Sequence, residues 1–177
     1  MCVRRLVLVG VVATSISAVG LPAVEISFPS GDRQTVGGAA EPVPLAAGDL
    51  DGDGDLDLVA GLGSGVAWWE NLDGFGGAWA RHEVEDAVHH VDGVDVADLD
   101  GDGDLDLVAG ASSEGEIRWY ANLGGGSAWT VRVVANAVAG VSSVTAGDLD
   151  GDGDRDLLAT AFDGGQVSWW SNDDGLG

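Results

Sequence analysis

Residues 49–61 read Asp-Leu-Asp-Gly-Asp-Gly-Asp-Leu-Asp-Leu-Val-Ala-Gly, and residues 98–110 repeat this segment without a change. A third copy starts at Asp148 and differs at three positions, where Arg155, Leu158 and Thr160 replace leucine, valine and glycine. The copies begin 49 and 50 residues apart. A period of this length indicates a propeller or a β-solenoid, an array of similar small units that are each packed on their neighbours.

A second segment recurs downstream of each acidic copy. An aromatic pair is followed two residues later by an asparagine, in Trp68-Trp69-Glu70-Asn71, Trp119-Tyr120-Ala121-Asn122 and Trp169-Trp170-Ser171-Asn172. In the second unit we expect four short strands, at 94–97, 105–111, 116–122 and 130–135. Neighbouring side chains of a strand face opposite sides of its sheet, so an aromatic pair needs apolar surroundings on both sides. The pattern predicts an all-β protein of four-stranded antiparallel β-propeller blades, with the paired aromatics in the core between blades.

The composition fits this fold class and excludes several partners. The 177 residues include 30 Asp and Glu against 7 Lys and Arg, for a formal net charge of −23. Nucleic acids and anionic membrane surfaces are excluded as partners, because phosphate contacts need clustered Lys and Arg. A hydrophobic content of 45% argues against intrinsic disorder, and 30 glycines favour short strands and tight turns. The partners that this charge favours are cations.

The aspartates of each copy have the spacing of a calcium-binding loop. Ca²⁺ takes about six to eight oxygen ligands, and short acidic loops supply them from alternate positions. In the first loop we expect the side chains at positions 1, 3, 5 and 9 and the backbone carbonyl at position 7 to be ligands. The candidate metal ligands are Asp49, Asp51, Asp53, Asp55, Asp57, Asp98, Asp100, Asp102, Asp104, Asp106, Asp148, Asp150, Asp152, Asp154 and Asp156. We expect about one Ca²⁺ per loop, and Mg²⁺, Mn²⁺ or a solvated turn without an ion are the alternatives.

The loop and the strand that follows it resemble the FG-GAP/VCBS repeats of integrin-α-type β-propellers, over about residues 45–177. An EF-hand does not fit, because Ala60, Ala109 and Ala159 stand where the twelfth-position glutamate is needed. The resemblance implies a seven-bladed propeller in which each loop binds Ca²⁺ between the first two strands of a blade. It also implies that the loop aspartates are the ligands. The Phe-Gly and Gly-Ala-Pro segments that name the family are mostly missing here.

The first 23 residues are predicted to be a secretory signal peptide or, alternatively, a retained signal anchor. Arg4 and Arg5 precede an apolar run that begins at Leu6. The remaining chain divides into a strand or closure segment (24–44), repeat 1 (45–93), repeat 2 (94–143) and a truncated repeat 3 (144–177). A propeller needs about four to eight blades, whereas this chain has three repeats, so we expect a piece of a longer propeller, secreted or on the cell surface. An open three-blade array and a ring of several chains are the alternatives.

The sequence offers no catalytic constellation: a nucleophile elbow, a phosphate-binding loop and a Cys/His cluster are all missing. We expect a non-enzymatic calcium-binding module, structural or adhesive, with an extracellular protein or glycan as its ligand. The alternative is a fragment of an extracellular propeller enzyme that acts on polysaccharides and carries its catalytic residues elsewhere. Contact with a membrane is expected only if residues 1–23 are retained as an anchor.

Overall fold

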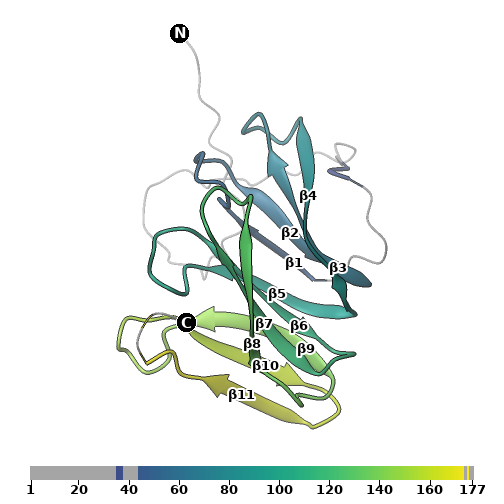
Figure 1. Ribbon diagram of the computed structural model, residues 1–177, viewed down its shortest axis with the longest axis vertical. Coiled ribbons are helices and arrows are strands. Elements are labelled where there is room, and N and C mark those ends of the chain that lie inside the picture. The colour runs from purple at the N-terminus through teal and green to yellow at the C-terminus, as the bar shows by residue number, and fades with distance from the viewer. Residues whose placement is uncertain (1–34, 38–43, 174, 176–177) are drawn as a thin grey trace, which may run out of the picture. The chain divides into compact units, whose positions relative to one another are not determined.

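The computed structural model describes residues 35–37, 44–173 and 175, all within the unit Thr35–Gly177. In this part of the chain every regular element is a strand (Figure 1). The strands are β1 (Leu45–Gly48), β2 (Asp57–Gly61), β3 (Ser64–Asn71), β4 (Trp79–His89), β5 (Val91–Ala97), β6 (Asp106–Ala111), β7 (Glu116–Asn122), β8 (Trp129–Ala135), β9 (Val141–Gly147), β10 (Asp156–Ala161) and β11 (Gln166–Trp170). The predicted all-β class is confirmed.

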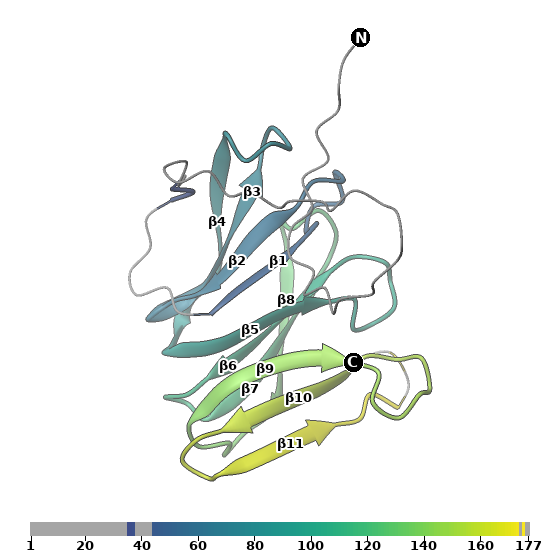
Figure 2. The same cartoon turned by 180° about the vertical axis from the view of Figure 1, so that it is seen from behind.

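The strands form three antiparallel sheets in the order of the sequence repeats. The first two sheets have four strands each, in the orders β1-β2-β3-β4 and β5-β6-β7-β8, and the third has the order β11-β10-β9. The first strand of each sheet contacts the first strand of the next, β1 with β5 and β5 with β9, which gives three propeller-like blades (Figure 2). In the second blade β7 has the predicted bounds, and the other three strands start within three residues of the prediction.

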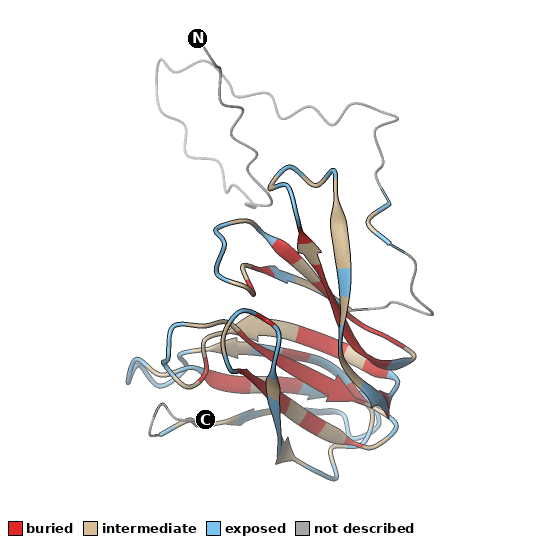
Figure 3. Cartoon of the chain, turned by 45° about the horizontal axis from the view of Figure 1, so that its top comes forward, coloured by how far each residue is buried: buried red, intermediate tan, exposed pale blue. Residues whose placement is uncertain are grey.

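The aromatic pairs occupy both faces of the blades, as the alternation of a strand requires. Trp68 and Tyr120 belong to the hydrophobic cluster between the first and second blades, and Trp119 belongs to the cluster between the second and third. Figure 3 shows buried residues concentrated where blades face one another. Trp69 packs with partly buried Val36 on the other face of the first blade. Since Tyr120 and Trp119 lie in the clusters on its two sides, the second blade is buried on both faces.

The third blade departs from the expectation that the paired tryptophans are core residues. Trp170 packs against the cluster beneath it, but Trp169 is 48% exposed and Val167 on the same strand is 79% exposed. Trp169 is the repeat equivalent of Trp68 and Trp119, which lie between blades. Within the described residues no further sheet packs on this face, so the side chain remains in solvent.

Polar side chains also join the blades. Arg118 on β7 donates from Nη1 to Glu85 Oε1 on β4 at 2.8 Å, and the Tyr120 hydroxyl donates to Glu85 Oε2 at 2.7 Å. The Arg118 and Glu85 side chains are mostly buried. Between the second and third blades, Asp95 accepts hydrogen bonds from the Thr145 hydroxyl and the Ala146 amide. These bonds set the position of each blade on the next.

The predicted signal segment, residues 1–23, lies outside the described residues. Of the predicted closure segment, 24–44, the structure describes only 35–37 and 44. Both predictions therefore stay predictions. The part of the chain that is described holds no helix with the length and apolar character needed to span a membrane.

Candidate metal centre

Each acidic segment forms the loop between the first two strands of its blade. Two glycines per loop have a positive φ, +78° at Gly52 and +95° at Gly54 in the first loop, and their repeat equivalents behave alike. Side chains with a Cβ rarely adopt this conformation, which explains why glycine alternates with aspartate here. The glycines at the fourth and sixth positions of each loop therefore both permit the tight turn.

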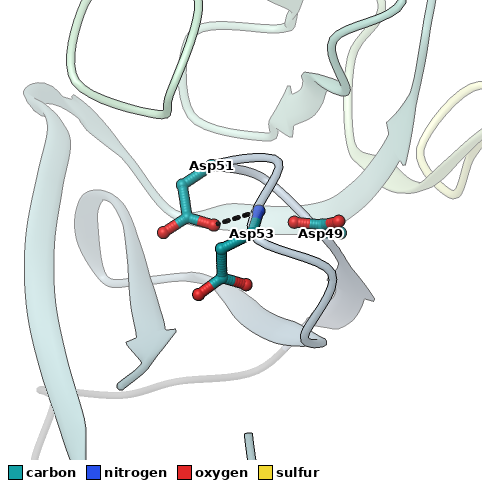
Figure 4. A group of neighbouring side chains, drawn as sticks. All are labelled: Asp49, Asp51 and Asp53. Atoms are coloured by element: carbon teal, nitrogen blue, oxygen red, sulfur yellow. Dashed lines mark hydrogen bonds between the residues drawn. The ribbon is translucent and has the colours of Figure 1, made fainter. Parts of the chain in front are cut away.

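The carboxylates fold the loop around themselves. Asp49 accepts hydrogen bonds from the Gly52 amide at 2.9 Å and from the Gly54 amide at 3.0 Å. Asp51 accepts from the Asp53 amide at 3.1 Å, and Asp53 accepts from the Asp55 amide at 2.9 Å. Local bonds in which an aspartate carboxylate accepts from a nearby backbone amide favour tight turns over regular strands. The side chains at positions 1, 3 and 5 are thereby held on one short loop (Figure 4).

Three carboxylates gather in each loop. In each group one oxygen per residue lies within 4.8 Å of the others, and the groups are Asp49, Asp51 and Asp53; Asp98, Asp100 and Asp106; and Asp148, Asp150 and Asp156. All of the clustered donors are carboxylate oxygens, which suit a hard cation such as Ca²⁺, Mg²⁺ or Mn²⁺. These residues could hold a metal ion.

The grouping follows the predicted ligand set only in part. Positions 1 and 3 take part in every loop, whereas the third member is position 5 in the first loop and position 9 in the other two. Among the described residues, Asp57, Asp102, Asp152 and the three aspartates at position 7 belong to no group. The full set of predicted ligands stays a prediction.

The aspartate at position 9 has a structural role that the sequence analysis missed. Asp57, Asp106 and Asp156 are almost completely buried. In the second loop Asp106 accepts the Leu99 amide at 3.1 Å and the Asn122 amide at 2.8 Å, and the other two aspartates make the equivalent pair of bonds. This carboxylate therefore ties the start of the loop to the third strand of the blade. An ionised carboxylate offers about four lone-pair sites, so the two amide bonds leave capacity for a cation.

The side chain at position 7 lies against the turn after the third strand. A Cβ added to Gly74 would collide with the Asp55 carboxylate, and one added to Gly175 would lie 2.6 Å from Oδ1 of Asp154. The glycine in that turn therefore makes room for the aspartate. With its side chain directed there, position 7 has its backbone carbonyl left as the predicted ligand atom.

Burial and mutual repulsion raise the pKa values of several loop carboxyls. Burial raises the pKa of Asp57 and of Asp106, although the amide bonds to each oppose the shift. Burial is also the largest cause of the raised pKa of Asp51 and of Asp100, and the charges of neighbouring aspartates add to it. Ionisation of these four carboxyls is therefore less favourable than that of a free aspartate, and a positive charge close to them would favour it.

At position 9 the third loop differs from the first two, although the pKa of Asp150 at position 3 is raised as in the other loops. Hydrogen bonds from the amides of Asn172 and Leu149 lower the pKa of Asp156. Leu149 is 43% exposed, whereas its equivalents in the first two loops are buried. Less of the chain surrounds the third loop, so the two amide bonds lower the pKa of Asp156 by more than desolvation raises it.

The asparagine after each aromatic pair is a second residue whose role the sequence analysis missed. Its Nδ2 donates to the carbonyl at loop position 8, at 3.3 Å for Asn71 and Leu56 and at 3.1 Å for Asn122 and Leu105. Its Oδ1 accepts amides of the turn that follows, such as that of Gly76. The recurrence of this asparagine at the same position in all three units was the signal in the sequence. The recurrence alone does not show which groups its side chain bonds to.

Comparison with known proteins agrees with the geometry. The model of the FG-GAP-like repeat matches residues 49–109 and 98–159, which together span more than half of the chain. The chain belongs to the FG-GAP-like repeat family, and the resemblance noted from its sequence is confirmed. Among the curated proteins, none matches this sequence.

Proposed function

We propose that this chain is a calcium-binding β-propeller repeat module of a secreted or cell-surface protein. The observation that carries the proposal is the recurrence, in three successive blades, of a carboxylate cluster on the same inter-strand loop. A single acidic cluster is common on protein surfaces. Three clusters built by the same turn geometry, with the pKa of the position-3 carboxyl raised in each, favour cation binding over chance.

The residues that would hold the ion are the clustered aspartates, with positions 1 and 3 common to the three loops. Ca²⁺ is favoured over Mg²⁺ because it accepts more ligands with less regular geometry, and the loops offer carboxylates and backbone carbonyls in excess of six. The cation would relieve the repulsion between carboxylates and stabilise each loop. This role matters in a chain whose one cysteine, Cys2, lies in the proposed signal segment.

The module is proposed to be structural or adhesive, without catalytic activity of its own, and part of a larger propeller ring. Its ligand would be an extracellular protein or glycan. Family membership and the predicted signal segment support the extracellular placement. A propeller fold by itself does not specify a ligand, because unrelated functions share it.

Calorimetric titration of the chain with Ca²⁺ tests the cation site. We expect saturation near three ions, one for each cluster, with a rise in melting temperature relative to chelator. The triple variant Asp51→Asn, Asp100→Asn and Asp150→Asn keeps the shape of the loops and removes one clustered charge from each. It should lose most of the bound calcium.

A matched control removes acidic residues outside the loops. Asp86 and Asp163 are exposed and belong to no cluster. The double variant Asp86→Asn and Asp163→Asn should bind calcium as the parent does. Calcium binding that falls equally in both variants would show a general charge effect, and unchanged stoichiometry in the triple variant would refute the ligand assignment.

A further inference from the structure

The asparagines of the second and third blades reach across to the loop of the preceding blade. Asn122 Nδ2 donates to the Leu50 carbonyl at 2.8 Å, over 72 residues of sequence. Asn172 Nδ2 donates to the Leu99 carbonyl at 2.8 Å, over 73 residues. Each bond is shorter than the bond that the same Nδ2 makes within its own blade. The same connection is therefore built twice, from one blade to the one before it.

The carbonyl that receives this bond occupies a particular place in the loop. Leu50 stands between Asp49 and Asp51, two members of the first carboxylate cluster. Its amide donates to Asp57 in its own blade at 2.9 Å, while its carbonyl accepts from Asn122 in the next blade. Leu99 is held in the same manner by Asp106 and Asn172. The peptide groups between the first two clustered aspartates are thus fixed from two blades at once.

This arrangement bears on the cost of assembling the cation site. Like charges within 4.8 Å repel, so a loop without a cation tends to open. A contact that holds the loop in its closed form reduces the ordering that must accompany binding. The Asn122 side chain is completely buried, so its amide cannot exchange the carbonyl for water without undocking the blade.

We propose that Asn122 and Asn172 are positioning residues that couple each cation loop to the docking of the following blade. The coupling is reciprocal by thermodynamic linkage: a docked blade raises the affinity of the preceding loop, and a cation in that loop stabilises the contact between the blades. The inference rests on the proposed cation binding. It adds that the sites of successive blades are dependent on one another.

The third loop provides an internal comparison. Within the described residues, the Leu149 carbonyl receives no bond from an asparagine, and Leu149 is 43% exposed where Leu50 and Leu99 are buried. We expect the third loop to fill at a higher Ca²⁺ concentration than the first two. The expected difference is about fivefold, the factor that corresponds to one net hydrogen bond.

Site-resolved titration of the whole chain tests the coupling. The amides of Gly52 and Gly54 report the first loop in ¹⁵N NMR spectra, and those of Gly101 and Gly103 report the second. Asn122→Leu should raise the Ca²⁺ concentration that half-saturates the first loop by about fivefold, in addition to its effect on its own loop. Asn172→Leu should shift the second loop and leave the first unchanged.

Asn71→Leu is the matched control. Asn71 makes the bond within its own blade, to Leu56, and the described residues show no bond from it to another blade. This variant should affect the first loop alone. If Asn122→Leu and Asn172→Leu each shift only the loop of their own blade, the coupling between blades is refuted while calcium binding stands. If the parent chain binds no Ca²⁺ in any loop, the proposed function itself fails.

A measurement on the unmodified chain guards against variants that do not fold. The side-chain NH₂ protons of Asn122 and Asn172 should exchange with solvent at least several-fold more slowly in Ca²⁺ than in chelator, because the cation stabilises the contact between blades. The Asn71 side chain serves as the reference. Equal protection in Ca²⁺ and in chelator for all three asparagines would also overturn the coupling.

Discussion

Replacing Asp106 separates the structural role of the loop carboxylates from their role in cation binding. Both Asp106 oxygens accept buried backbone amides, from Leu99 at 3.1 Å and from Asn122 at 2.8 Å. Asp106→Ala leaves both amides without their acceptor. Asp102, in the same loop, is exposed and accepts one bond from the neighbouring Asp104 amide. The two positions carry the same charge and differ in what they hold together.

The magnitude follows from the two orphaned amides. A buried donor left without a partner costs about 1–3 kcal/mol, so two cost about 2–6 kcal/mol. Part of this is offset, because burial raises the pKa of Asp106 and an unfavourable charge disappears with the side chain. We expect Asp106→Ala to lower the free energy of unfolding by about 3 kcal/mol in chelator. At about 2–4 °C per kcal/mol for a unit of this size, the melting temperature falls by about 6–12 °C.

Thermal and urea unfolding in chelator measure this difference without any contribution from a cation. Asp102→Ala should change the free energy of unfolding by no more than about 0.5 kcal/mol in chelator, since it relieves repulsion and exposes no buried group. Both variants should weaken calcium binding. If Asp106→Ala melts within the error of Asp102→Ala in chelator, the structural role assigned to position 9 is wrong.

Three further predictions concern the contacts between blades and the response to pH. Glu85→Ala should lower the free energy of unfolding by about 2–3 kcal/mol in urea titrations, because Arg118 and the Tyr120 hydroxyl lose a mostly buried partner. The control variant Glu83→Ala, at an exposed residue, should lower it by less than about 1 kcal/mol. Equal effects of the two variants would contradict the network between blades. Gly126→Ala would place a Cβ 2.6 Å from a Trp68 ring carbon and should lower the melting temperature more than Gly125→Ala, which has a similar positive φ and open space. In chelator, five loop carboxyls have a raised pKa and one has a lowered pKa, so the folded chain binds more protons than the unfolded chain at acidic pH. The free energy of unfolding should therefore rise as the pH falls through the raised pKa values, and the gain should be complete below the unfolded value of about 3.9. In Ca²⁺ the same acidification should lower the melting temperature, because protons displace the cation; the same slope in both buffers would refute this reasoning.

Local chemistry is sufficient to predict the blades and the loops. The strand at 116–122 was predicted with its observed bounds because a glycine turn precedes it and a turn-forming Asn-Leu-Gly segment ends it. The alternation of Asp and Gly likewise predicts a tight loop, and the structure shows a positive φ at both Gly52 and Gly54. Such features depend on neighbours within a few residues, which a sequence displays directly.

Which faces of the blades are buried was harder to predict from the sequence. Trp68 and Trp169 occupy equivalent positions of the repeat, yet the first is buried between two blades and the second is 48% exposed. Both tryptophans follow a valine by two residues and precede a second tryptophan, so the local sequence does not distinguish them. What differs is the presence of another sheet on that face, which belongs to the packing of the whole unit and not to the local sequence.

The sequence by itself determined the repeat, the strands and the oxygen-rich loops, because each arises from residue types at short and regular spacing. Only the tertiary structure decided which aspartate closes the loop and which lies open to a cation, since Asp53 and Asp57 have the same side chain and differ in burial. It alone also showed that Asn122 bonds to Leu50. The partner in that bond is a backbone carbonyl, which every residue carries, so no residue type at position 50 could have indicated it.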